Sequence, residues 1–208
     1  MQLHFDAQLP HQHDALQVVL GLFEGPPALP PDTTIRPTPE IASVRPNMLP
    51  VDVITLLANL QSTQTAAGLP VSPSLPRPST QHATGIDVAL EMETGTGKTY
   101  TYVRTILELS KRHGLNKWLI IAPSIAVREG VLGTLRDTRE HFRSLLPGVT
   151  YRFWAYDGRP ERMRSFATAA TLEIAVLTIA AFNKISNRLR RPDDRFGGLA
   201  PLDWVAAA

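Results

Sequence analysis

The chain has 208 residues, enough for one hydrophobic core with or without an appendage. Its net charge of +2 does not by itself indicate a nucleic-acid-binding protein, and the absence of cysteine excludes a disulfide scaffold and a cysteine-based zinc site. No apolar run approaches the roughly 18 residues of a membrane helix, and the N-terminus lacks a signal-peptide pattern, so we expect a soluble, cytoplasmic protein.

Two kinds of sequence precede residue 86. Residues 9–24 place apolar side chains at helical spacing, which predicts a short amphipathic helix within an N-terminal element of residues 1–25. Residues 26–85 carry most of the 18 prolines of the chain, a density that excludes a long helix or a central strand. We interpret them as an extended insertion that contains one helix, over residues 51–68.

From residue 86 onward, apolar strands alternate with amphipathic helices. Strands are predicted over residues 86–92, 117–124, 149–157 and 172–182, and helices over residues 98–113, 125–146 and 159–170. This alternation is typical of right-handed crossovers and indicates an α/β fold with a mostly parallel sheet.

A phosphate-binding loop is predicted between the first of these strands and the helix that follows, over Thr94, Gly95, Thr96 and Gly97. The two glycines can adopt backbone angles that are closed to other residues, so successive N–H groups can point at phosphate oxygens. Lys98 is expected to reach the β- and γ-phosphates of ATP, and the Thr99 hydroxyl to bind the Mg²⁺ between them. The alternative is a chance glycine-rich turn with a solvated lysine, which the flanking elements make the weaker interpretation.

The loop departs from the general consensus at Met92, where most phosphate loops have glycine. Superfamily II helicases commonly do without that glycine, and METGTGKT resembles their motif A-x-x-G-x-G-K-T.

Upstream, LPHQHDA resembles the helicase element L-R-x-Y-Q-x-x-A, whose glutamine pairs with adenine. Gln12 is the matching position, and a side-chain amide can donate and accept at once. A surface glutamine is the alternative. His4, His11 and His13 lack a carboxylate or cysteine partner at metal-ligand spacing, and we interpret them as solvated.

A longer run is similar to one particular family. The segment VALEMETGTGKTYTYVRTILELSKRHGLNKWLIIAPSIAVREGVL resembles the Res subunit of type III restriction enzymes, as do LTIAAFNKISN (residues 177–187) and the first residues of the chain. The resemblance implies a RecA-like P-loop domain over residues 86–208 that uses ATP and Mg²⁺. It also implies a helicase-type translocase on double-stranded DNA, with a separate nuclease domain and a methyltransferase (Mod) partner subunit.

The same resemblance assigns DNA-contacting residues. Pro123 and Ser124 match a motif that contacts a DNA strand, and Arg128 would add charge to that contact. Thr178 matches a later motif that contacts the same strand. A plain helix N-cap is an equally good interpretation of Ser124, and a buried threonine at a strand end is a strong alternative for Thr178. The arginines near residues 187–196 are better interpreted as solvated charges than as a specific patch.

The chain also departs from the family. It contains no D-E-x-H or D-E-P-Q motif, the element that holds the carboxylates for Mg²⁺ and the attacking water in a helicase. We therefore expect an N-terminal fragment whose RecA-like domain is incomplete. We also expect that the strands at residues 86–92 and 172–178 are left beside a missing neighbour.

Two other classes of function stay open from the sequence. A small P-loop phosphotransferase would suit the chain length, with NRLRRPDDR as an arginine-bearing lid, although such kinases place the loop near the N-terminus. A remnant without catalytic activity is the third possibility. DNA-stimulated ATP hydrolysis, compared with phosphorylation of a substrate, distinguishes the first two classes.

Overall fold

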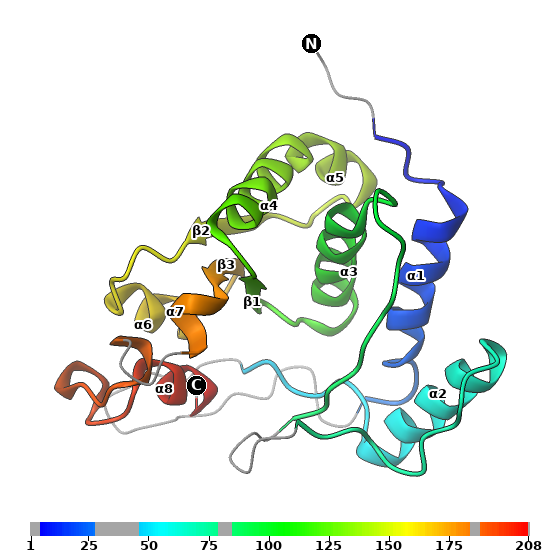
Figure 1. Ribbon diagram of the computed structural model, residues 1–208, viewed down its shortest axis with the longest axis horizontal. Helices are drawn as coiled ribbons and strands as arrows, with labels where there is room; N and C mark the ends of the chain where they lie inside the picture. Colours follow the sequence, from blue (N-terminus) through cyan, green and yellow to red (C-terminus); the bar gives the residue numbers. More distant parts are fainter. Residues whose placement is uncertain (1–4, 28–45, 79–84, 184–187, 208) are drawn as a thin grey trace. The chain divides into compact units, whose positions relative to one another are not determined.

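The computed structural model describes residues 5–27, 46–78, 85–183 and 188–207. His4, much of the proline-rich insertion and residues 184–187 therefore lie outside the described part of the chain. Figure 1 labels the elements in chain order. They are α1 (Pro10–Gly21), α2 (Val53–Ala66), α3 (Lys98–His113), β1 (Lys117–Ala122), α4 (Ile125–Asp137), α5 (Arg139–Leu145), β2 (Tyr151–Ala155), α6 (Glu161–Ala167), β3 (Leu172–Thr178), α7 (Ile179–Asn183), the 3₁₀ turns η1 (Arg188–Arg190) and η2 (Asp194–Phe196), and α8 (Pro201–Ala207).

The chain divides into two compact units. One contains α1, α2, the segment that leads to the predicted phosphate loop, and α3 as far as Glu108. The other contains the end of α3 and everything that follows it, together with Asn47. The predicted phosphate loop and the predicted DNA contacts therefore belong to different units.

A three-stranded parallel sheet forms the centre of the second unit. The strand order is β1-β3-β2, so β3 is paired on both edges. The register joins Ala122 to Thr178 at one end and Tyr151 to Leu172 at the other. Since all three strands are parallel, their carboxyl ends lie along one edge of the sheet and their amino ends along the opposite edge.

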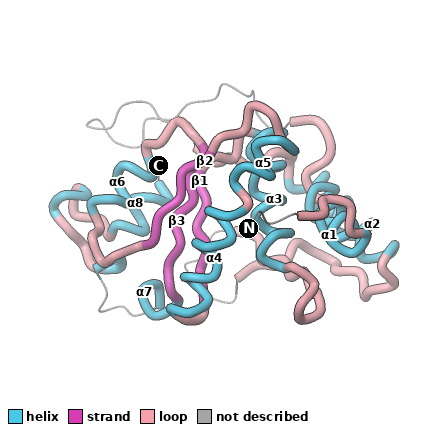
Figure 2. The backbone as a smooth tube through the Cα atoms, turned by 90° about the horizontal axis from the view of Figure 1, so that it is seen from above, coloured by secondary structure: helices cyan, strands magenta, loops and turns pink. Residues whose placement is uncertain are grey.

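Helices cover both faces of this sheet. Figure 2 shows α4 on one face and α6 with α8 on the other. The second face is rich in aromatic side chains: the ring of Trp154 packs edge-on against Phe166, and Phe196 packs edge-on against Trp204. Side chains on β3 at the centre of this layer are fully buried, as expected for a strand covered on both sides.

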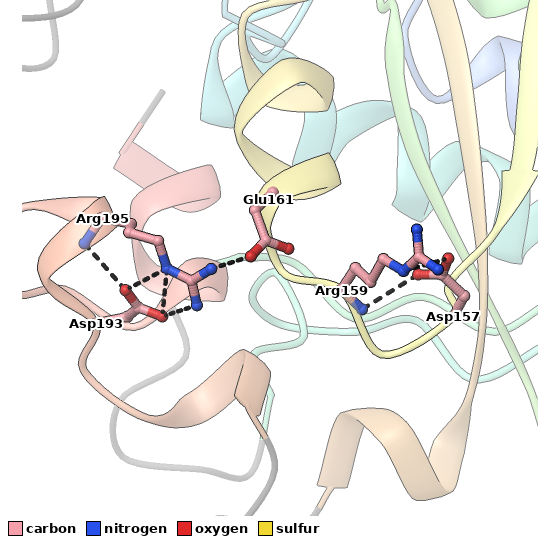
Figure 3. Close-up of polar contacts among 5 residues, drawn as sticks. All are labelled: Asp157, Arg159, Glu161, Asp193 and Arg195. Atoms are coloured by element: carbon pink, nitrogen blue, oxygen red, sulfur yellow. Dashed lines mark hydrogen bonds and ion pairs between the residues drawn. The ribbon is translucent and has the colours of Figure 1, made fainter.

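Ion pairs on the surface connect η2 to α6 (Figure 3). The Arg195 guanidinium contacts the carboxylates of Asp193 and Glu161. Asp157 accepts a hydrogen bond from the Arg159 amide at 3.1 Å. Such exposed pairs contribute little stability, so the aromatic layer beneath them holds this region together. Within the predicted arginine run, Arg195 is therefore already paired with carboxylates.

The first unit has a small core of its own. Asp52 begins α2, and hydrogen bonds from the amide and hydroxyl of Thr55 lower the pKa of its carboxyl group. Downstream of the helix, Gln64 bonds both the amide and the hydroxyl of Ser72, which holds the returning chain against α2. The buried cluster consists of Leu22, Val51, Leu56 and Leu60, with Phe23, Leu75 and Ile86 packed against it.

The strand predicted before the phosphate loop is not formed. Within residues 86–92 the Asp87 amide donates to the Pro76 carbonyl, no strand ladder is formed, and the side chains of Val88 and Leu90 are exposed. An isolated strand leaves its amides and carbonyls without a ladder, so apolar composition alone does not stabilise one. The prediction was wrong because the described chain offers this segment no partner strand.

Other boundaries also differ from the sequence prediction. The expected helix over residues 125–146 is interrupted at Thr138, whose hydroxyl donates to the Thr134 carbonyl at 2.6 Å; such back-bonding often bends helices. The strand expected over residues 172–182 ends at Thr178, where its β1 partner also ends, and continues as α7. The expectation that residues 172–178 lack a neighbour was wrong too, because β3 is the central strand.

Truncating a side chain of the central strand tests this arrangement. Leu177→Ala removes a side chain that is 0% exposed, and we expect the free energy of unfolding to fall by about 2–5 kcal/mol. Ile125→Ala is the matched control, because Ile125 is 64% exposed and its truncation is expected to cost no more than about 0.5 kcal/mol. Urea unfolding measures both, and equal losses would contradict the placement of β3 at the centre.

Candidate functional site

The predicted phosphate loop has the backbone conformation that its glycines permit. Gly95 has a φ of 82° and Gly97 a φ of 83°, both in the left-handed region that side chains with a Cβ rarely adopt. The loop closes on itself through the Thr96 hydroxyl, which donates to the Glu93 carbonyl at 2.7 Å. The chain then enters α3 at Lys98. The loop-to-helix transition expected from the sequence is therefore present, although the preceding strand is not.

Residues from α1 hold this loop from one side. The Gln12 side chain is almost completely buried, and its Nε2 donates to the Thr96 carbonyl at 2.9 Å. Nε2 of His11 lies 3.1 Å from the same oxygen. A Cβ added to Gly97 would lie only 2.3 Å from the Gln12 Nε2 atom. A side chain at position 97 would therefore be strained by the left-handed backbone and would force the Gln12 amide to move.

This contact bears on the role predicted for Gln12. The amide carries two N–H donors and an acceptor oxygen, and the loop uses one of the donors. One N–H and the oxygen remain, which is the pair that the edge of adenine requires. The sequence pattern indicated a glutamine near ATP but did not indicate that this glutamine and His11 would support the loop itself.

The start of α3 can accept an anion. The first N–H groups of a helix have no partner within the helix, and in the described chain no acceptor is seen for the amides of Lys98 and Thr99. The Lys98 ammonium donates to the carbonyls of Met92 and Glu93, at 2.5 Å each, which keeps its charge beside the loop. Together these groups form a cationic, donor-rich surface of the kind that holds a phosphate.

The predicted DNA contacts gather at the carboxyl edge of the sheet. Thr178 ends β3 opposite Ala122, and Pro123 and Ser124 follow Ala122 directly. Pro123 and Ser124 are exposed, and Thr178 is half-buried. The Ser124 hydroxyl accepts from the Val127 amide at 3.3 Å, so the N-cap interpretation holds in this structure. The parallel register thus brings Ser124 and Thr178, which are far apart in the sequence, to the same edge of the sheet.

Arg128 lies in the first turns of α4, near the same edge. Its guanidinium donates to the neighbouring Glu129 carboxylate at 2.8 and 3.1 Å. This pair is exposed on the Glu129 side, so a stronger anion can compete with it at low cost.

The chain was compared with protein families and with curated proteins. Residues 46–199 match the model of the family described as "Type III restriction enzyme, res subunit". The chain belongs to this family. The RecA-like P-loop fold class predicted from the sequence is confirmed, with an α/β unit built on a parallel sheet.

Three curated Res subunits are similar to the chain. The EcoP15I Res subunit of Escherichia coli is 31% identical over 143 residues, which are 66% of this chain and 13% of that protein. The EcoPI Res subunit of Escherichia phage P1 is 50% identical over 60 residues, 28% of this chain and 6% of that protein. The StyLTI Res subunit of Salmonella typhimurium is 40% identical over 58 residues, which are 27% of this chain and 6% of that protein. The chain therefore matches only a small part of each relative's length.

Among the described residues there is no cluster of three or more histidine and carboxylate side chains able to bind a metal ion on its own. The described helices include none long and apolar enough to span a bilayer.

The contact between Gln12 and Gly97 can be tested by a double-mutant cycle. Gly97→Ala and Gln12→Ala should couple by about 1 kcal/mol, because the first change displaces the side chain that the second removes. Gly95→Ala is the matched control: its φ is equally left-handed, but no atom lies within 4 Å of the added Cβ. Its effect should add to that of Gln12→Ala. Thermal unfolding measures the cycle, and the same coupling for both glycines would contradict the contact.

Proposed function

We propose that the chain is the ATP-binding and DNA-binding start of a helicase-type translocase module, with a role in restriction-modification like that of the Res subunits it resembles. The observation that carries this proposal is the loop Thr94–Gly97, with left-handed Gly95 and Gly97 at the start of α3. A Mod-type methyltransferase is the partner that the resemblance implies.

Each group at the loop is proposed to contact a different part of the nucleotide. The amides at the start of α3 hold phosphate oxygens, and Lys98 exchanges its two carbonyl partners for the β- and γ-phosphates. Thr99, half-buried in the first turn, ligates Mg²⁺ through its hydroxyl. Gln12 presents its remaining N–H and its oxygen to adenine. ATP with Mg²⁺ supplies the free energy for movement along DNA.

The carboxyl edge of the sheet contributes the contact to a DNA strand. Amides at the start of α4, the Ser124 hydroxyl and the Arg128 guanidinium are donors suited to a phosphate oxygen. These contacts position the strand and do not read its sequence. Thr178 adds a hydroxyl at the neighbouring strand end. We infer that the chain alone binds both ligands without coupling them to hydrolysis, since its sequence has no D-E-x-H or D-E-P-Q motif.

The loop assignment predicts a specific loss of nucleotide binding. Lys98→Ala should abolish measurable binding of Mg-ATP, because it removes the cation that neutralises the β- and γ-phosphates. Arg136→Ala is the control: it removes an exposed cation from the last turn of α4, outside every site proposed for this chain, and should leave the affinity unchanged. Titration calorimetry decides between them. Equal affinities of the wild type and the Lys98 variant would refute the assignment.

The DNA assignment predicts a change in salt dependence. Arg128→Gln should weaken binding of a DNA duplex and lower the slope of log affinity against log salt by about one. Arg136→Gln, at the other end of α4, makes the same change of charge and should have no such effect. Fluorescence anisotropy over a range of salt concentrations measures both slopes, and identical slopes would count against a phosphate contact at Arg128.

A further inference from the structure

Several positively charged side chains gather at the amino edge of the sheet, on residues that neither site described above uses. Two hollows adjoin there, of about 350 and 370 Å³, and they share four lining residues. Thr150 and Thr171 are among the shared residues, and each directly precedes a strand of the sheet. This groove lies at the opposite edge of the sheet from Ser124 and Thr178. The site at the carboxyl edge therefore does not explain it.

Cationic side chains reach the groove from three elements. Arg139 and Arg143 come from α5, Arg152 from β2, and Lys111 from the end of α3. They lie at positions scattered along the chain, so no charge run in the sequence indicates them. Only the pairing of β2 with β3 and the packing of α5 bring them to one place.

Arg139 is held in position before any ligand arrives. Its guanidinium carbon lies 5.4 Å from the ring centre of Tyr151 and 5.3 Å from that of Phe153, and Nη2 donates to the Tyr151 carbonyl at 3.3 Å. Stacking on two rings restricts the side chain while most of its N–H donors stay unused. A donor fixed in this way loses little entropy when it binds an anion.

The other cationic side chains of the groove have few interactions with the rest of the protein. Arg152 and Lys111 are exposed, and no ion pair or side-chain hydrogen bond is seen for either in the described chain. Arg143 pairs with Glu140 at 3.1 Å, but both side chains are largely exposed, so a bound anion can replace that carboxylate at low cost. Glu140 is the only carboxylate that contacts these cations among the interactions seen in the described residues.

We propose that this groove is a second DNA-backbone site, in which Arg139, Arg152 and Lys111 bind phosphate groups and the hydroxyls of Thr150 and Thr171 donate to their oxygens. Arginine forks, a lysine ammonium and hydroxyls are together suited to phosphate, and two adjoining hollows that are each lined by at least one cation suit an extended polyanion. The choice of DNA as the source of phosphate rests on the proposed function. The site itself lies on residues that the proposed function does not use.

The test uses the whole 208-residue chain and a short fluorescein-labelled DNA duplex. Arg152→Gln should weaken binding severalfold and lower the salt slope by about one, because one phosphate contact is lost. Thr171→Glu should weaken it further, since it places a carboxylate in the groove without removing any buried group. Arg136→Gln is the control of equal charge change outside the groove. Circular dichroism melting confirms that each variant is folded.

Each outcome has a distinct meaning. If both groove variants bind DNA as tightly as the wild type while Arg128→Gln still weakens binding, the groove is not a DNA site. The proposed function would then still stand. No DNA binding by the wild type would overturn both the DNA part of the proposed function and the groove. Displacement of the duplex by inorganic phosphate at equal phosphate concentration would show a small-anion site and overturn the assignment to DNA. Loss of binding in the groove variants alone, resistant to inorganic phosphate, is the result expected.

Discussion

The pairing of β3 with a parallel strand on each edge is the constraint on which the rest of the second unit depends. It buries β3 on both faces and aligns the strand ends, so Thr178 lies opposite Ala122 and Leu172 opposite Tyr151. In a parallel sheet these alignments separate the polar loops into two edges. The carboxyl edge receives Ser124 with the start of α4, and the amino edge receives the arginine-lined groove. Both proposed DNA contacts therefore depend on a single register.

A different kind of constraint organises the phosphate loop. There the backbone must hold two left-handed residues in close succession, which only glycine does without strain. Burial of the Gln12 amide against the Thr96 carbonyl adds a steric limit at Gly97. The nucleotide contact that we propose for Gln12 and the support of the loop thus depend on one side chain. A change at Gln12 is expected to alter the shape of the loop as well as the proposed contact to adenine.

The two proposed DNA sites differ in how they hold their donors. At the carboxyl edge, Arg128 is paired with its neighbour Glu129 and the remaining donors come from the start of a helix. At the amino edge, Arg139 is positioned by aromatic rings of the edge strand. Contacts to phosphate alone allow a strand to be released and bound again in a shifted position, because every nucleotide presents the same group.

Much of the fold could be predicted from the amino-acid sequence, because the evidence for it is local. The loop glycines, Lys98 and Thr99 lie close together in the sequence, α3 has a regular apolar period and ends at the left-handed Gly114, and the three paired strands are short segments rich in apolar residues. Only the tertiary structure decided features that need a partner from elsewhere in the chain. Residues 86–92 are apolar yet form no strand, because a strand exists only when another pairs with it. The burial of Gln12 against Thr96, and the convergence of Arg139, Arg152 and Lys111 on one groove, join positions far apart in the sequence. No spacing rule connects such positions, and only folding brings them together.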